Sequence, residues 1–216
     1  MQQAEFVRTT YESLMEQTKR LVQRKAEPEA YVPSEERYAV LHLTVEADGR
    51  EEHRERDLNR AQIGIMRFVT VIAQIVSGWG GKLIEASHQS YTAIFPTEEE
   101  DAVGRSCLCG MQIVQAIDNV INPSLAEEGI PFRFRGGVGI SMGQVYGFHT
   151  GLSLPANSLY YGEAITSAVE YANMTDGEVI VDKVVKEHFE RSGSEYKVQF
   201  VPYRYHEWVG YRFHIG

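Results

Sequence analysis

Two hydrophobic periods alternate along the chain, and the order of this alternation limits the folds that it can adopt. Residues 57–77 repeat apolar side chains at helical spacing and form a stripe wide enough to cover a sheet: Leu58, Ala61, Ile65, Phe68, Val69, Ile72, Ile75 and Val76. Strand patterns lie at 38–45, 82–86, 90–95, 132–141, 144–148 and 177–182, and further helical patterns at 98–120, at 163–173 and in a short stretch ending at Phe189. This order predicts an α+β fold with a ferredoxin-like βαββαβ core.

The two ends add an N-terminal helix and a C-terminal β-hairpin. Residues 196–213 alternate bulky and polar side chains like two strands joined by a turn. Residues 3–25 place Val7, Tyr11, Leu14, Thr18 and Leu21 at alternating spacings of four and three. This is the pattern of a short coiled coil, and a helix packed on its own domain would fit it equally well. We therefore expect a helix and linker at 1–36 and one domain at 37–216.

Composition excludes several classes of partner. The net charge of -9 and the pI of about 5.3 argue against a surface that binds nucleic acid. No apolar run approaches the roughly 20 residues that cross a bilayer, so we expect no membrane insertion and a cytoplasmic location. Cys107 and Cys109 are two residues apart on a helix, where their side chains point in different directions and cannot hold a metal together. No cofactor is expected.

Three groups of residues resemble the cyclase homology domain of class III adenylate and guanylate cyclases. They are YAVLHL followed by Thr44, GGKLIEASHQSYTAIF at 80–95, and RGGVGISMGQVYGF together with LYYGEAITSAVEYA in the C-terminal half. The likeness covers roughly residues 38–190. It implies a dimer with sites at the subunit interface, where two aspartates hold two divalent ions against a nucleoside triphosphate.

The positions that this resemblance assigns to chemistry carry other residues here. Thr44 and Gln89 stand where the two metal-binding aspartates are expected, and neither supplies an anionic oxygen. The residues that read the base, orient the ribose and stabilise the transition state are replaced by Glu85, Glu163, Thr166 and Glu170. The glycine turn that holds phosphates after the first strand is replaced by the long polar segment 45–56.

Two alternatives remain open for the acidic residues of this region. Glu46 and Asp48, with Glu51 and Glu52, could form a displaced metal site, or they could lie in a solvated loop with neighbouring arginines. Glu85, Glu163 and Glu170, beside His88, could converge on a groove for a cationic or hydroxyl-rich ligand. The same groove could instead be filled by side chains, with the carboxylates paired to Lys82, Arg133 or Arg135.

The sequence therefore favours a non-catalytic, cyclase-like module that acts as a dimeric regulatory, sensor or scaffold domain. We expect a homodimer, with a further protein partner in a signalling system, and neither catalytic residues nor a metal. Two alternatives remain. One is an atypical nucleotidyl cyclase that relocates its metal ligands to Glu46 and Asp48, and the other is a small-molecule receptor that uses the groove between subunits.

Overall fold

The structure is a computed structural model, and it describes residues 9, 11–13, 15–16, 19, 36–49, 55–87, 89–130, 132–149, 158–192 and 197–216. The described residues before 20 are helical, as expected for the N-terminal helix. Of its five seam positions only Tyr11 is described, and its side chain is exposed. The expected linker lies almost wholly outside the described residues, as does His88.

A seven-stranded sheet forms the centre of the domain, with the order β2-β3-β1-β4-β7-β9-β8. Its strands are β1 (Arg37–Gly49), β2 (Lys82–Ala86), β3 (Ser90–Pro96), β4 (Phe132–Gln144), β7 (Val179–Val181), β8 (Val198–Tyr205) and β9 (Trp208–Ile215). Only the β4–β7 pair is parallel. The expected α+β class, the order of the core elements and the C-terminal hairpin are all confirmed.

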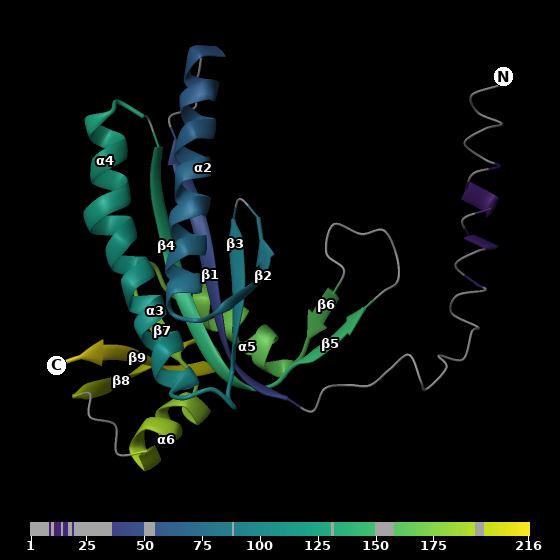
Figure 1. Cartoon of the computed structure of the whole chain (residues 1–216), viewed down its shortest axis with the longest axis vertical. Coiled ribbons are helices and arrows are strands. Elements are labelled where there is room, and N and C mark those ends of the chain that lie inside the picture. The colour runs from purple at the N-terminus through teal and green to yellow at the C-terminus, as the bar shows by residue number, and fades with distance from the viewer. Residues whose placement is uncertain are drawn as a thin grey trace.

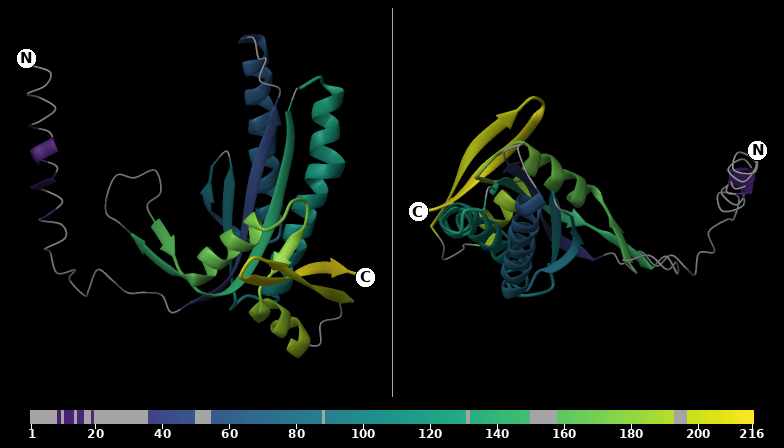
Figure 2. Two further views of the ribbon diagram at one scale, coloured as in Figure 1. Left: turned by 180° about the vertical axis from the view of Figure 1, so that it is seen from behind. Right: turned by 90° about the horizontal axis from the view of Figure 1, so that it is seen from above.

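Helices cover both faces of the sheet. One face carries α2 (Glu55–Gly78), α3 (Ala102–Ala116) and α4 (Asn122–Glu127) (Figure 1), while α5 (Glu163–Asn173) lies on the other (Figure 2, left). Because both faces are covered, the first half of β1 carries a run of consecutive apolar residues from Tyr38 to Leu41. Ala39, Leu41, Leu43 and Val45 pack under α2 and α3, and Val40 packs under α5.

Strand β1 is longer than the sequence indicated. Residues 46–49 were expected to begin a loop, but they continue the ladder with β4 as far as the pair Gly49–Phe132. Glu46 lies opposite Arg135, and Asp48 lies opposite Arg133. Facing residues of opposite charge stabilise an antiparallel pair, which accounts for the extension.

The helix expected at 98–120 begins and ends later than predicted. Residues 97–101 form turns, and Asp101 adopts a left-handed conformation with φ of 49°. The helix α3 then continues through a π-helix, η2 (Ile117–Ile121), into α4. A single π-turn of this kind shifts the phase of the helix by about one residue. Ile117, Ile121 and Leu125 consequently all reach the core.

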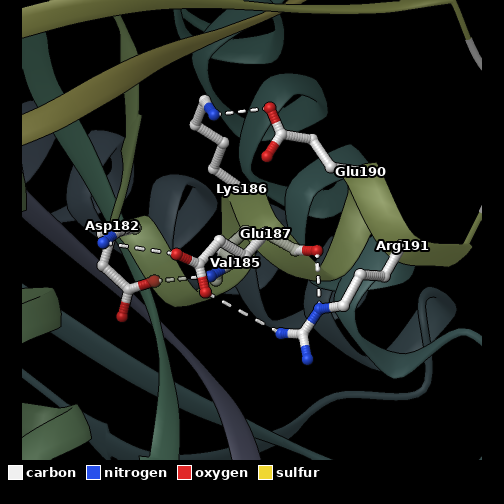
Figure 3. A network of polar contacts seen from close by, with 7 residues as sticks. Asp182, Val185, Lys186, Glu187, Glu190 and Arg191 are labelled. Carbon is white, nitrogen blue, oxygen red and sulfur yellow. Dashed lines mark hydrogen bonds and ion pairs between the residues drawn. The ribbon is translucent and has the colours of Figure 1, made fainter.

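The last part of the domain completes the main core. α6 (Lys183–Ser192) directly follows Asp182, whose Oδ1 accepts a hydrogen bond of 2.6 Å from the N–H of Val185 (Figure 3). Oδ2 of the same carboxylate accepts bonds from Ser141 and from the N–H of Met142 on β4. Asp182 therefore fixes the start of α6 to the sheet. The ion pairs further along this helix, shown in the same figure, lie on its exposed side.

A small second sheet was not expected. β5 (Tyr146–His149) pairs with β6 (Ser158–Tyr161), a segment whose sequence indicated only a loop. The pair extends away from the main sheet (Figure 1). Lys82 on β2 donates a hydrogen bond of 2.7 Å to the Tyr160 hydroxyl, which connects this pair to the body of the domain.

The helix α2 has an unusual composition. Its segment Arg60–Gly78 has a mean hydropathy of 1.4, so by length and composition alone it could cross a membrane, contrary to the expectation that no apolar run is long enough. In the structure Phe68, Ile72 and Val76 of this helix are fully buried against the sheet. Phe68 stacks on Phe134 of β4, with 4.2 Å between ring centroids.

Close packing of α5 on β4 depends on two glycines. A Cβ atom at Gly139 would lie 2.0 Å from the carbonyl oxygen of Ala168, and one at Gly137 would lie 2.5 Å from that of Ala172. These neighbours are backbone atoms and cannot move aside without shifting the helix. The two glycines therefore set the distance between α5 and the sheet.

We predict that Gly139→Ala lowers the free energy of unfolding by roughly 2–3 kcal/mol, because the added methyl group forces α5 away from β4. Urea unfolding followed by circular dichroism measures the change. Gly78→Ala is the matched control, since a Cβ there meets nothing within 4 Å. Equal stability of the two variants would show that α5 does not pack this tightly.

Candidate functional site

The residue at the first expected metal position is bound within its own chain. Thr44 lies on β1 between Ser90 of β3 and Gly137 of β4. Its Oγ1 donates a hydrogen bond of 2.8 Å to Oδ1 of Asn173, the last residue of α5. The close approach of α5 to β4 makes this bond possible. The site thus offers a neutral hydroxyl that already has a partner.

The hairpin between β2 and β3 carries the second expected metal position. The carbonyl oxygen of Gln89 accepts a hydrogen bond of 2.7 Å from the N–H of Val45, which fixes the hairpin against β1. Its side chain is exposed. Gln89 and Thr44 are therefore neighbours across the β1–β3 pair, as the resemblance predicts for two metal-binding positions, but they bring no carboxylate.

Glu85 lies at the start of a chain of hydrogen bonds. Its carboxylate accepts bonds from the hydroxyls of Ser90, at 3.2 Å, and Thr92, at 3.0 Å. The Thr92 oxygen also lies 2.9 Å from Nδ1 of the buried His42. Because the single Thr92 proton is donated to Glu85, Nδ1 of His42 must be the donor to Thr92. Nδ1 of His42 therefore carries a proton, as it does both in one neutral tautomer and in the charged ring.

The burial of His42 favours the neutral form of its ring. Burial lowers the pKa of its imidazole below the ordinary value, because a charged ring loses hydration there, while the nearby Glu85 carboxylate raises it by a smaller amount. No motif in the sequence singles out His42. The signal that could have found this network is alternation, since His42, Thr92 and Glu85 lie on adjacent strands and face the same side.

The three residues expected on α5 share one side of the helix but have different surroundings. Glu163 begins the helix and lines a cavity of about 510 Å³ together with Arg37, Ser141 and Asp182. The Thr166 hydroxyl bonds back to the carbonyl of Gly162. Glu170, two turns after Glu163 and about 10 Å along the axis, is partly buried.

The structure does not join these carboxylates with Glu85 inside one chain. Glu85 is bonded to its own hairpin, and Lys82, which was considered as its partner, bonds to Tyr160 instead. A groove lined by all three glutamates stays a prediction about two subunits.

Glu46 and Asp48 lie on a strand and face arginines. Both are exposed on β1, opposite Arg135 and Arg133 of β4. Within the described part of the chain, no group of three or more His, Cys, Asp and Glu side chains could hold a metal ion. The loop geometry that a relocated metal site would use is absent at residues 46–49, because these residues are paired along the sheet.

A second cavity of about 510 Å³ opens beside Thr44. It lies between the C-terminal end of α5, the β1–β4 pair and β8, and its walls include Glu46, Arg135, Asn173, Tyr203 and Tyr205. The Tyr203 hydroxyl bonds to the carbonyl of Met174, and its ring lies under the guanidinium of Arg212. Sequence analysis missed Asn173 and both tyrosines, since their contribution depends on how the C-terminal hairpin meets α5.

This arrangement is the fold of the class III nucleotidyl cyclase domains. A guanylyl cyclase, Cya2, matches with a TM-score of 0.63 and 17% identity over 83% of this chain and 94% of its own. The adenylyl cyclase CyaB from P. aeruginosa matches with a TM-score of 0.64 and 11% identity over the same shares of the two chains. A bacterial light-regulated adenylyl cyclase matches over 98% of this chain and 63% of its own, with a TM-score of 0.62 and 14% identity.

Sequence comparisons give no match, either to a protein-family profile or to a curated protein. The resemblance inferred from the three groups of residues is nevertheless confirmed at the level of the fold. At identities of 11–17% these matches describe the architecture, and they do not test the residues of the site.

We predict that the stability of the domain falls as the pH drops below about 6.5, the ordinary pKa of histidine, because His42 binds a proton less readily when folded than when unfolded. Its contribution is complete above that value and is lost as the pH falls toward the lower folded pKa. Urea unfolding at pH 7.5 and 5.5 measures this loss. In His42→Asn, which keeps a donor for Thr92, the loss between the two pH values should be smaller; an unchanged loss would assign it to other groups.

Proposed function

We propose that this chain is a non-catalytic, cyclase-like module that serves as a dimeric regulatory or scaffold domain. The proposal rests on the identity of residue 44 and on the hydrogen bond that its side chain makes. Where a metal-binding carboxylate is needed at the end of the first strand, the chain has a hydroxyl already bonded to Asn173. Two divalent ions cannot be held by Thr44 and Gln89, because neither side chain supplies anionic oxygen.

The extension of β1 supports the same conclusion. In the cyclase scheme a short turn after the first strand holds the phosphates with backbone N–H groups. Here β1 continues from Thr44 to Gly49, which is about 17 Å of strand. The N-terminal end of α2 lies toward the far end of this strand (Figure 1), so its N–H groups, which favour anions, are far from Thr44.

The charges of the expected site also oppose a triphosphate. Glu85 stands on β2 where a base-reading lysine is expected, and Glu170 stands on α5 in place of the transition-state arginine. A carboxylate at either position repels a polyphosphate and destabilises the negative charge that develops in phosphoryl transfer. The chain thus lacks the residues for three separate requirements of the cyclase reaction: metal ligation, phosphate binding and stabilisation of the transition state.

A dimer is the assembly that the fold and its exposed surfaces favour. The cyclase scheme places its sites between subunits. The β5–β6 pair extends from the body and exposes Leu159 and Tyr161, at 41% and 43% of their surface. A two-stranded sheet of this size gains little stability by itself. Burial of these two side chains against a second subunit would stabilise the β5–β6 pair. Such a homodimer could also transmit a conformational change from the N-terminal helix to a protein partner in the cytoplasm.

We predict that the purified protein forms no cyclic nucleotide from ATP, GTP, CTP or UTP with Mn²⁺, at rates above a blank without protein. Mass spectrometry of the products tests this, and melting temperatures with each Mn²⁺–nucleotide pair should equal those with Mn²⁺ alone.

Product that disappears in Glu46→Gln or Glu163→Gln, but persists in the exposed control Glu127→Gln, would establish the atypical cyclase instead. Stabilisation by Mn²⁺–nucleotide without product would point to a nucleotide receptor. Either result contradicts the absence of a triphosphate site.

We predict that Leu159→Asp halves the mass of the protein in sedimentation equilibrium, because a carboxylate at this position would be buried against the second subunit. Val201→Asp is the matched control, since Val201 is an apolar residue of β8 with similar exposure, 42%. A monomeric wild-type protein, or equal masses for both variants, would contradict a dimer formed through β5–β6.

A further inference from the structure

The cavity beside Thr44 has a fixed wall on the side of the C-terminal hairpin. Glu178 accepts a hydrogen bond of 2.9 Å from Nε of Arg212. The guanidinium of Arg212 lies 4.4 Å from the centre of the Tyr203 ring, and the Tyr203 hydroxyl donates a bond of 2.8 Å to the carbonyl of Met174. These contacts hold the wall in one position without the help of a ligand.

The walls of the same cavity present charged groups of both signs. Arg135, Glu46 and Asp176 line it, and all three are exposed. Within the part of the chain that the structure describes, none of their side chains has a hydrogen bond or an ion pair, although Glu46 and Arg135 face each other across β1 and β4. One cation and two anions are therefore available to a ligand.

An amide and an aromatic ring complete the set of groups in the cavity. Oδ1 of Asn173 accepts the hydrogen bond from Thr44, so the NH2 group of this amide remains as a donor. Tyr205 follows Tyr203 by two residues on β8, lines the same cavity and exposes 49% of its surface. An amide donor binds a carboxylate oxygen, and the face of a tyrosine ring attracts a cation.

The mixture of charges selects against a ligand that carries only one sign of charge. Arg135 repels a simple cation, and Glu46 and Asp176 repel a simple anion. A molecule with both charges pairs with all three groups at once, and a guanidinium binds a carboxylate through two parallel hydrogen bonds. The volume of about 510 Å³ lies within the range of about 300–1,000 Å³ that is typical of small-molecule sites.

We propose that this cavity binds a small zwitterion of the amino-acid type, which carries one ammonium and one carboxylate group. Arg135 and the amide of Asn173 hold the carboxylate. Asp176 and Glu46 hold the ammonium group, and the ring of Tyr205 covers it. Because the walls come from α5, the β1–β4 pair and β8, the bound ligand joins the C-terminal hairpin to the rest of the domain.

The inference rests on the proposed function, because a metal–nucleotide complex beside Thr44 would compete for the same space. The two proposals fail separately. Formation of a cyclic nucleotide contradicts the non-catalytic module, and the binding of a zwitterion has no part in that assay. Failure of every zwitterion to bind removes only the ligand and leaves the non-catalytic module intact.

Ligand binding to the purified full chain tests the inference. Melting temperatures are measured with each standard amino acid and with glycine betaine at about 10 mM, and calorimetry gives the Kd of those that raise the melting temperature. Choline, propionate and glucose are the matched probes, since they carry only the cation, only the carboxylate or only hydroxyl groups. At least one zwitterion should bind at least about tenfold more tightly than each of these three probes.

Substitutions that remove one charge at a time locate the site. Arg135→Gln and Asp176→Asn should each raise the Kd of the zwitterion at least about tenfold. Arg133→Gln and Asp118→Asn are the matched controls and should leave it unchanged, since both residues are exposed and line a neighbouring cavity of about 260 Å³ instead. Arg135→Gln should also let choline bind more tightly than it binds the wild-type protein, because the repelling cation is gone.

Several results would overturn the inference. One is the absence of binding by every amino acid and by glycine betaine. Another is a Kd for choline, propionate or glucose as low as that of the best zwitterion, which would assign the cavity to that simpler class of ligand. A third is an equal loss of affinity in Arg133→Gln and Arg135→Gln. Melting of each variant without ligand separates lost affinity from lost structure.

Discussion

The close contact between α5 and β4 is the constraint on which the rest of the candidate site depends. Gly137 and Gly139 allow the backbone of α5 to lie directly on the strand. At this distance the last residue of the helix, Asn173, reaches the hydroxyl of Thr44. The same contact buries Val40 and His42 under or beside the helix. One pair of glycines therefore determines both the packing of this face and the loss of a free ligand at the end of the first strand.

Much of the fold could be predicted from the sequence because its signals are local. The apolar stripe of residues 57–77 and the alternation at 82–86 and 90–95 depend only on each segment's own period, and the structure places a helix and two strands there. Strand extension at 46–49 could not be predicted in this way, since its stability comes from Arg133 and Arg135, nearly ninety residues later. A strand was expected at 144–148, where β5 lies, but β6 was missed although it follows β5 after only a short segment.

The candidate site was predictable only in part, and for a related reason. The residues that stand at the expected metal and base-reading positions follow from motif order, because Thr44, Glu85 and Gln89 lie in segments with a recognisable pattern. Their hydrogen-bond partners do not. Asn173 and Tyr203 come from other elements and lie outside the three motifs, and nothing in the motif around Thr92 marks it as the partner of Glu85. What a residue is bonded to is a property of the assembled sheet.

The central position of β1 has a consequence for the order in which the domain can form during synthesis. Thr44 pairs with Ser90 on one side and with Gly137 on the other. At about 5–20 residues per second, the ribosome needs several seconds after β1 emerges before its second neighbour exists. During this interval one edge of an apolar strand has no partner in the nascent chain. The domain is accordingly most prone to misassembly after its first hundred residues have been synthesised and before β4 follows, and a chaperone would act at this stage.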